Sequence, residues 1–265
     1  MPTTVPSAYD LTGQVALVTG SSSDLGIGFA SARLLGQFNA AVMVTGTTDR
    51  AAERAAELRA EGIVAHSFVA DLMDPDAAGD LVAATIAEFG KLDILVNNAG
   101  LASVNIPERP NSLMVMTDEE WALALRRNVD SAFFVTRAAL PGMVERGYGR
   151  IINVASTAGI LTAYTGDVGY HTAKAAMLGM TRSVAVDYAK NGVTANVVIP
   201  GWIATAAQLP SEVAAGNATP IGRSASAAEV AAGIAFFATP GASYVTGTTL
   251  AIDGGNSIAG ATGPE

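Results

Sequence analysis

Short runs of β-branched and apolar residues alternate along the chain with longer alanine-rich stretches. Such runs are typical of strands, and their alternation with helical stretches predicts βαβ units around a parallel sheet. Seven runs predict seven strands, at Val15–Thr19, Ala41–Thr45, Val64–Ala70, Leu92–Val96, Arg150–Val154, Val193–Val198 and Thr248–Ile252. We therefore predict an α/β fold, a doubly wound seven-stranded parallel sheet flanked by helices on both faces. In such sheets, ligands bind beyond the carboxyl ends of the strands.

Composition narrows the class of protein. The 265 residues fit one domain, residues 1–265, and a 50% hydrophobic content is enough for a large core. Every apolar run is interrupted before the roughly 18 residues that a membrane span needs. The first ten residues lack the basic flank and apolar core of a signal peptide. We therefore expect no membrane association.

The net charge and the cysteine and histidine content argue against several kinds of partner and metal site. The formal net charge of −9 argues against nucleic acid or anionic lipid as partners. The chain has no cysteine, which excludes disulfides and thiolate metal sites and is consistent with a cytoplasmic protein. With only His66 and His171 as imidazoles, we expect no metal and no zinc-dependent chemistry.

A glycine-rich segment, residues 19–28, directly follows the first predicted strand. Glycines allow a tight turn and a close approach of backbone to a pyrophosphate, and a helix that starts near Gly26 offers free N–H groups. An ordinary Gly/Ser turn is the alternative. The position between a strand and an amphipathic helix favours dinucleotide binding.

The end of the second strand bears on the choice of cofactor. Proteins that prefer NAD usually carry a carboxylate there, whereas this chain has Gly46-Thr47. Two threonine hydroxyls and Arg50 could hold the 2′-phosphate of NADP, while Asp24 and Asp49 oppose it. We predict NADP, with NAD as the open alternative.

Polar residues also follow the third and fourth strands. The carboxylate of Asp71, next to Leu72, could accept from an adenine amino group; capping of a helix before Pro75 is the alternative, for which Asp74 is better suited. After the fourth strand, small residues and amides let the chain pass close to a ribose, and the candidate contacts are Asn98, Ala99 and Gly100. A plain turn is the alternative there.

A loop at residues 101–117 is expected to line the substrate cleft. Thr117 and Glu120 form a capping box that begins a helix carrying Asn128. Asparagine is unfavourable inside a helix, because its amide competes for backbone bonds. Asn128 therefore holds either a water that links to Lys174 or a neighbouring carbonyl. The pair Arg126-Arg127 is expected to form a solvated or subunit-facing patch.

The candidate chemistry lies between Ser156 and Lys174. Tyr170 and Lys174 are four residues apart and share one face of a helix that Asp167 could cap, and Ser156 follows a strand. A free phenol, with a pKa of about 10, is a poor base near neutral pH. An ammonium about 5 Å away would favour the phenolate by roughly 3 kcal/mol at an effective dielectric of about 20. A hydroxyl, a phenol and an ammonium suit proton transfer coupled to hydride transfer.

The rest of the chain adds a helix that runs to about Lys190 and then a turn at Pro200-Gly201. The helix is rich in small and adaptable residues, which suits close packing against another helix, from this chain or from a second subunit. After the turn, the backbone of Ile203 could pair with a carboxamide and Thr205 could reach a phosphate. Residues 202–223 are expected to form a second substrate loop, with a mobile lid at 206–223.

These motifs together resemble the short-chain dehydrogenase/reductase family in its non-extended, Rossmann-fold branch. The resemblance covers residues 10–257 and rests on TGSSSDLGIG, NNAG, Asn128, Ser156, Tyr170-x-x-x-Lys174, PGWIAT and DGG. It implies that Tyr170 is the general acid/base and that Lys174 holds the nicotinamide ribose and lowers the tyrosine pKa. Ser156 would bind the substrate oxygen, and Asn128 would position a water in a proton relay.

The same resemblance implies a set of cofactor contacts. The pyrophosphate would lie against Gly20, Ser22, Gly26, Ile27 and Gly28. The adenine, ribose, carboxamide and phosphate would be contacted by Asp71, Asn98, Ile203 and Thr205 respectively. Two departures from the family pattern stand out: two extra residues between Gly20 and Gly26, and one extra between Ser156 and Tyr170, which Gly166 and Gly169 could absorb.

We predict an NAD(P)(H)-dependent oxidoreductase that interconverts a secondary alcohol and a ketone on a small molecule, as a homodimer or homotetramer. One alternative is a 3-oxoacyl-carrier-protein reductase, a subgroup that the sequence also resembles. That subgroup presents arginines to its acidic carrier where this chain has Pro141 and Val186, so small keto compounds rank higher. A non-catalytic dinucleotide-binding sensor or scaffold is the alternative from another class; such proteins commonly lose the Tyr or Lys, and both are present.

Overall fold

The computed structural model describes residues 5–100, 111–206 and 208–259. Its main sheet has seven parallel strands in the order β3-β2-β1-β4-β5-β6-β9. They are β1 Val15–Val18, β2 Ala41–Gly46, β3 Ala65–Val69, β4 Ile94–Asn97, β5 Gly149–Val154, β6 Val193–Pro200 and β9 Thr249–Ile252. All seven predicted strands are confirmed, with only small differences at their ends.

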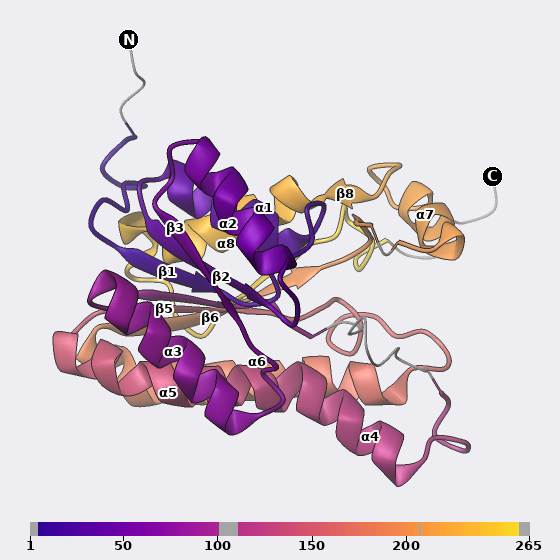
Figure 1. Ribbon diagram of the computed structural model, residues 1–265. Coiled ribbons are helices and arrows are strands. Elements are labelled where there is room, and N and C mark those ends of the chain that lie inside the picture. Colours follow the sequence, from indigo (N-terminus) through magenta and orange to yellow (C-terminus); the bar gives the residue numbers. More distant parts are fainter. Residues whose placement is uncertain (1–4, 101–110, 207, 260–265) are drawn as a thin grey trace.

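Helices cover both faces of this sheet, as predicted (Figure 1). On one face lie α1 Ile27–Gln37, α2 Arg50–Ala60 and α8 Ala227–Ala238. On the other lie α3 Pro75–Phe89, α5 Ser131–Arg146 and α6 Val168–Tyr188. Each face of the sheet has its own hydrophobic core, and successive residues of β1 contribute to different cores. Val18 packs towards α1 and α8, and Leu17 packs towards α3 and α5.

The strand order reverses direction beside β1. From β1 the chain builds outward through β2 and β3, then returns to the other side of β1 and continues through β4, β5, β6 and β9. Doubly wound folds bind their ligands in a crevice at such a reversal point, so we expect the cofactor at the carboxyl ends of β1 and β4.

Shorter elements complete the described part of the chain. They are α4 Asp118–Leu125, the π-helix η1 Arg126–Asp130, the 3-10 helices η2 Ala189–Asn191 and η3 Pro240–Ala242, and α7 Pro210–Asn217. Strands β7 Ile203–Ala204 and β8 Ala225–Ser226 pair in parallel as a small second sheet that the sequence pattern did not reveal. Within the described ranges, no helix combines the length and apolarity needed to cross a bilayer.

The structure describes the two predicted substrate loops to different extents. Residues 101–110 of the first lie outside the described residues, as does residue 207 of the second. The second is not an irregular lid throughout, because α7 occupies residues 210–217. Its closing motion stays a prediction.

Candidate active site

Lys174 is almost fully buried, with 2% of its surface exposed, in the first two turns of α6. Its Nζ donates a hydrogen bond to the carbonyl of Val154 at the end of β5, at 3.1 Å. The same Nζ lies 5.5 Å from the centre of the buried Tyr170 ring. A cation near a helix N-terminus opposes the helix dipole, and burying it costs further free energy. Helix stability therefore does not explain why a lysine occupies position 174.

Asn128 lies in η1, a π-helical turn between α4 and α5, and is fully buried. Such turns occur frequently at functional sites. Its Nδ2 donates to the carbonyl of Ala124 at 3.1 Å, whereas its buried Oδ1 has no hydrogen-bond partner among the described residues. The amide nitrogen of Asn128 is thus bound to a neighbouring carbonyl, one of the two expected partners. Its amide oxygen remains available to a further donor.

Asn128 and Lys174 face the same point. A Cβ built on Gly100 would stand 2.8 Å from Asn128 Oδ1 and 3.2 Å from Lys174 Nζ. Gly100 has a φ of +152°, which L side chains rarely adopt. A small residue there keeps the space between an orphaned acceptor and an ammonium open, which is the setting in which a bound water is stable.

Ser156 follows β5 and is partly buried, and its Oγ accepts from the N–H of Ala158 at 3.1 Å. The loop that it begins packs directly on α6, since a Cβ on Gly159 would stand 2.2 Å from the carbonyl oxygen of His171. Ser156 and Tyr170 are therefore carried by segments in direct contact. Of the two glycines expected to absorb the extra residue, Gly166 is left-handed with φ +85°, while Gly169 lies within α6.

Asp167 occupies the predicted cap position of α6 but does not cap it by a side-chain hydrogen bond. Its carboxylate instead accepts from the hydroxyl of Tyr164 at 3.1 Å. Burial raises the pKa of Asp167 above its usual value, against the opposing influence of the Tyr164 hydroxyl and the His171 imidazole. Residues 158–164 were expected to line the substrate cleft, but the hydrogen bond from Tyr164 to Asp167 and a role for His171 were not predicted. The signal that could have pointed to both is an aromatic residue close to Tyr170.

The glycine-rich segment makes a tight turn between β1 and α1. Gly20 is left-handed with φ +63°, and a Cβ on Gly28 would stand 2.5 Å from the Gly20 carbonyl oxygen. Helix α1 therefore approaches the end of β1 more closely than any side chain at position 28 permits. Gly26 precedes the first helical residue, Ile27, so the first turn of α1 has backbone N–H groups without intrahelical partners, as a pyrophosphate site requires.

The two extra residues of this turn are accommodated away from the sheet. Ser21 anchors the turn to β2: its Oγ donates to Val18 at 2.7 Å and accepts from the N–H of Thr45 at 3.0 Å. Beyond it, Asp24 and Leu25 are exposed. The turn is thus anchored to the sheet at Ser21 and exposed at its outer part.

At the end of β2, the side chain of Ser22 fills the space above Gly46, where a Cβ would lie 2.5 Å from its Oγ. Thr47 is exposed, and Nε of Arg50 donates to the Thr48 hydroxyl at 3.3 Å. A guanidinium and hydroxyls therefore stand where a carboxylate is usual in NAD-preferring proteins.

The loop after β4 is bonded to the loop after β1. The Asn98 amide donates to the carbonyls of Thr19 and Gly20, both at 3.0 Å. In return, the Thr19 hydroxyl accepts from the backbone N–H groups of Asn98 and Ala99. The side chain of Asn98 is therefore engaged in holding the crevice together.

The remaining predicted contacts lie at the same edge of the sheet. Asp74 caps α3 by accepting from Asp76, as expected, and the exposed Asp71 beside the buried Leu72 accepts from Met73 at 3.1 Å. Pro200 ends β6, and the N–H of Gly201 donates to Ile252 of β9. Ile203 pairs with Ala225, and Thr205 is partly buried just after β7.

The expectation of a solvated arginine pair was wrong for one of the two residues. Arg126 is exposed, but Arg127 is buried, with 5% of its surface exposed. The wider π turn of η1 brings the adjacent Arg127 and Asn128 both onto the buried side. A prediction based on regular helix spacing could not include this turn.

The fold and the site define a dinucleotide-binding oxidoreductase, and comparisons with known proteins agree. Residues 20–257 match the family profile described as "Enoyl-(Acyl carrier protein) reductase". A 3-oxoacyl-(acyl-carrier-protein) reductase of Vibrio cholerae is 38% identical over 250 residues, covering 93% of this chain and 98% of the relative.

Two solved structures are each 30% identical to this chain and cover 96% of it. A putative gluconate dehydrogenase from Agrobacterium tumefaciens has a TM-score of 0.88, with all of that chain covered. A gluconate 5-dehydrogenase from Burkholderia cenocepacia, in complex with NADP and tartrate, has a TM-score of 0.87 with 98% covered. The chain belongs to the short-chain dehydrogenase/reductase family and is an NAD(P)-dependent oxidoreductase acting on CH–OH and C=O groups.

The approach of α1 to β1 gives a test of the glycine turn. We expect Gly28→Ala to destabilise the protein by about 1–3 kcal/mol and to abolish stabilisation by NADP, because backbone atoms must move to admit the methyl group. Gly79→Ala in α3 is the matched control: its methyl group meets nothing within 4 Å, so it should be neutral or stabilise by up to about 1 kcal/mol. Thermal unfolding with and without NADP measures both. An unaltered response to NADP in Gly28→Ala would contradict the assignment.

Proposed function

We propose that the enzyme interconverts a secondary alcohol and a ketone with Tyr170 as the general acid/base. The observation that carries this proposal is the buried Lys174, with Nζ fixed by the Val154 carbonyl and 5.5 Å from the Tyr170 ring centre. An ammonium beside the tyrosine favours the phenolate over the phenol. The same ammonium is suited to hold the ribose hydroxyls of a dinucleotide.

The nicotinamide of the cofactor supplies or accepts the hydride when bound. In the direction of reduction, Tyr170 gives its hydroxyl proton to the carbonyl oxygen as the carbon gains the hydride, so that a ketone becomes a secondary alcohol. The Ser156 hydroxyl donates a hydrogen bond to the same oxygen and orients it. In oxidation, the Tyr170 phenolate takes the alcohol proton.

Proton supply to Tyr170 is assigned to Lys174 and Asn128. The unpartnered Oδ1 of Asn128 and the Nζ of Lys174 flank one point beside Gly100, which supports a water held between them. Such a water would return a proton through Lys174 to Tyr170 after each reduction. Asn128 is here a positioning residue.

A second candidate is reduction of an acyl group on a carrier protein, because the Vibrio cholerae relative carries the name of such a reductase. The positions compared above argue against it: neither Pro141 on α5 nor Val186 on α6 carries the positive charge that an acidic carrier would need. We therefore favour small ketones. Supplying a free and a carrier-bound ketone in parallel discriminates between the two.

Replacing one hydroxyl tests the reaction. Tyr170→Phe should lower kcat for reduction of a good ketone by at least about 10²-fold, the contribution expected of a general acid, with the cofactor Kd changed little. Tyr244→Phe, at a fully exposed position, is the matched control and should match the wild type. Cofactor oxidation followed by absorbance measures both. Near-normal turnover by Tyr170→Phe would refute the mechanism, and cofactor binding without turnover of any ketone by the wild type would favour the sensor alternative.

We also propose a preference for NADP, supported by Arg50 and the threonine hydroxyls after β2. A guanidinium bond to a phosphate is worth about 1.5–3 kcal/mol, so Arg50→Ala should weaken NADPH binding about 10-fold or more and leave NADH binding unchanged. Arg182→Ala, an exposed change on α6, is the control. Fluorescence titration of each protein with both cofactors measures the ratio. Tighter binding of NADH than of NADPH by the wild type would contradict the proposal.

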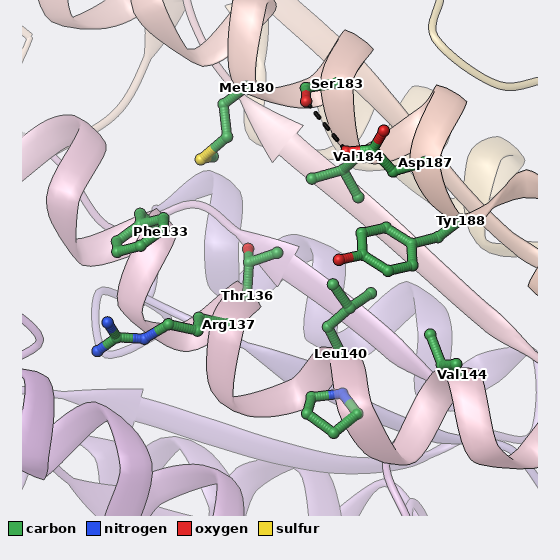
Figure 2. Close-up of a pocket in the computed structure, with 11 residues that line it drawn as sticks. Phe133, Thr136, Arg137, Leu140, Val144, Met180, Ser183, Val184, Asp187 and Tyr188 are labelled. Atoms are coloured by element: carbon green, nitrogen blue, oxygen red, sulfur yellow. Dashed lines mark hydrogen bonds between the residues drawn. The ribbon is translucent and has the colours of Figure 1, made fainter.

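A homodimer through α5 and α6 is the proposed assembly. Figure 2 shows the groove of about 580 Å³ between these helices, lined by Phe133, Thr136, Arg137, Leu140, Pro141, Val144, Met180, Ser183, Val184, Asp187 and Tyr188. A two-fold axis that packs α5 of one protomer against α6 of its partner would place Arg137 opposite Asp187 twice, once on each side of the axis. Light scattering should find a dimer, or a tetramer containing it, that Val184→Asp dissociates. A wild-type monomer at micromolar concentration would overturn this assembly.

A further inference from the structure

Aromatic side chains gather beside Tyr170. The rings of Tyr164 and His171 are in edge contact, with centroids 4.4 Å apart and planes at 68°. On its other side, Tyr164 faces Trp202, with centroids 6.3 Å apart and planes at 34°. His171 in turn lies next to Tyr170, at 6.5 Å. The set formed by Tyr164, His171 and Trp202, here named the aromatic wall, thus includes the residue that directly follows the proposed general acid.

The aromatic wall joins segments that meet at the carboxyl ends of β5 and β6. Tyr164 belongs to the loop after β5, His171 to α6, and Trp202 to the connection between β6 and β7. That loop is bonded to the end of β6, since the N–H of Thr157 donates to the Pro200 carbonyl at 2.9 Å. The wall therefore lies in the segments that flank Ser156 and Tyr170, at the edge where doubly wound sheets bind ligands.

The ring of Tyr164 is held by its hydroxyl, which donates to Asp167. Asp167 is buried, and burial raises its carboxyl pKa, so keeping this anchor charged costs free energy. Tyr164 itself is 45% exposed, so part of its ring is accessible to a ligand. An aromatic residue with its polar end bound presents an apolar face to whatever enters next to it.

The charged residues near the aromatic wall bear on the charge that the substrate can carry. From Ser156 to Gly222, the basic residues of the sequence are Lys174, Arg182 and Lys190. All three belong to α6 or to η2 at its end, and Lys174 is directed to Val154 beneath the site. Arg223, the last residue of the second substrate loop, is ion-paired with Glu229 at 2.8 Å. The described parts of the loops on either side of the wall thus offer no unpaired lysine or arginine to a carboxylate or phosphate. Arg109 lies outside the described residues. A keto acid, used below as an anionic substrate, tests whether a cation acts in binding.

We propose that the aromatic wall binds a flat ring and that the substrate is a neutral ketone with an aromatic or cyclic group next to the carbonyl. This inference rests on the proposed function, because it uses the position of Tyr170 as the point where the carbonyl oxygen lies. Stacking or edge contact with Tyr164 and Trp202 then orients the carbonyl carbon. Tyr164 is a specificity-determining residue in this arrangement.

Two methyl ketones of equal carbon number test the inference, one with a phenyl group and one with a hexyl chain. The wild type should show a kcat/KM about 10-fold higher for methyl phenyl ketone, as expected for aromatic contacts of this kind. Tyr164→Ala should bring the ratio near one, mainly by raising KM for the phenyl compound. Trp202→Ala should act in the same direction, and Tyr244→Ala, at an exposed position, is the matched control. An unchanged ratio in both wall variants overturns the proposal.

A binding measurement separates this inference from the reaction itself. In a Trp121→Phe/Tyr170→Phe protein, Trp202 is the remaining tryptophan, and methyl phenyl ketone should quench its fluorescence in a saturable way. Adding Tyr164→Ala should weaken that binding several-fold. Saturable quenching without turnover by the wild type supports the wall and refutes the proposed reaction. Turnover with equal kcat/KM for the two ketones, or a preference for a keto acid, leaves the reaction standing and overturns the wall.

Discussion

The hydrogen bonds between Asn98 and the carbonyls of Thr19 and Gly20 are the constraint on which the site depends. They join the loops after β1 and β4 at the place where the sheet reverses its order. Gly28 can approach only because these loops present bare backbone and the Asn98 amide, with no room for a methyl group. The crevice, the start of α1 and the segment leading to Gly100 are thereby positioned by one small set of contacts.

A second constraint concerns charge. Lys174 is buried near the start of α6, where the helix dipole repels a cation, and its Nζ is bonded to the end of β5. Asp167 adds a buried carboxylate at the same helix end. The Lys174 cation opposes the dipole of α6, and burying the Asp167 carboxylate costs free energy, so the compensating stability must come from the apolar layers on both sides of the sheet. The apolar packing thus offsets the free-energy cost of the charged groups at the site.

The strands were predictable because runs such as Val193–Val198 are buried on both faces, and burial selects the β-branched residues that mark them. The convergence of the segments carrying Ser156, Tyr170 and Lys174 was predictable because strand ends and helix spacing fix it. Arg127 was not, since an extra residue in one helical turn leaves no mark in a periodic pattern. Nor was the bond from Tyr164 to Asp167, which depends on the path of an irregular loop.

The π turn at Arg126–Asp130 makes the register of two helices interdependent. An α-helix advances by about 100° per residue, so a deletion of one residue anywhere in this turn would rotate α4 relative to α5 by roughly that angle. The capping box at Thr117 and the buried face of α5 could then not both keep their present neighbours. Length variation among relatives should therefore be tolerated in the exposed loops and be rare in this turn.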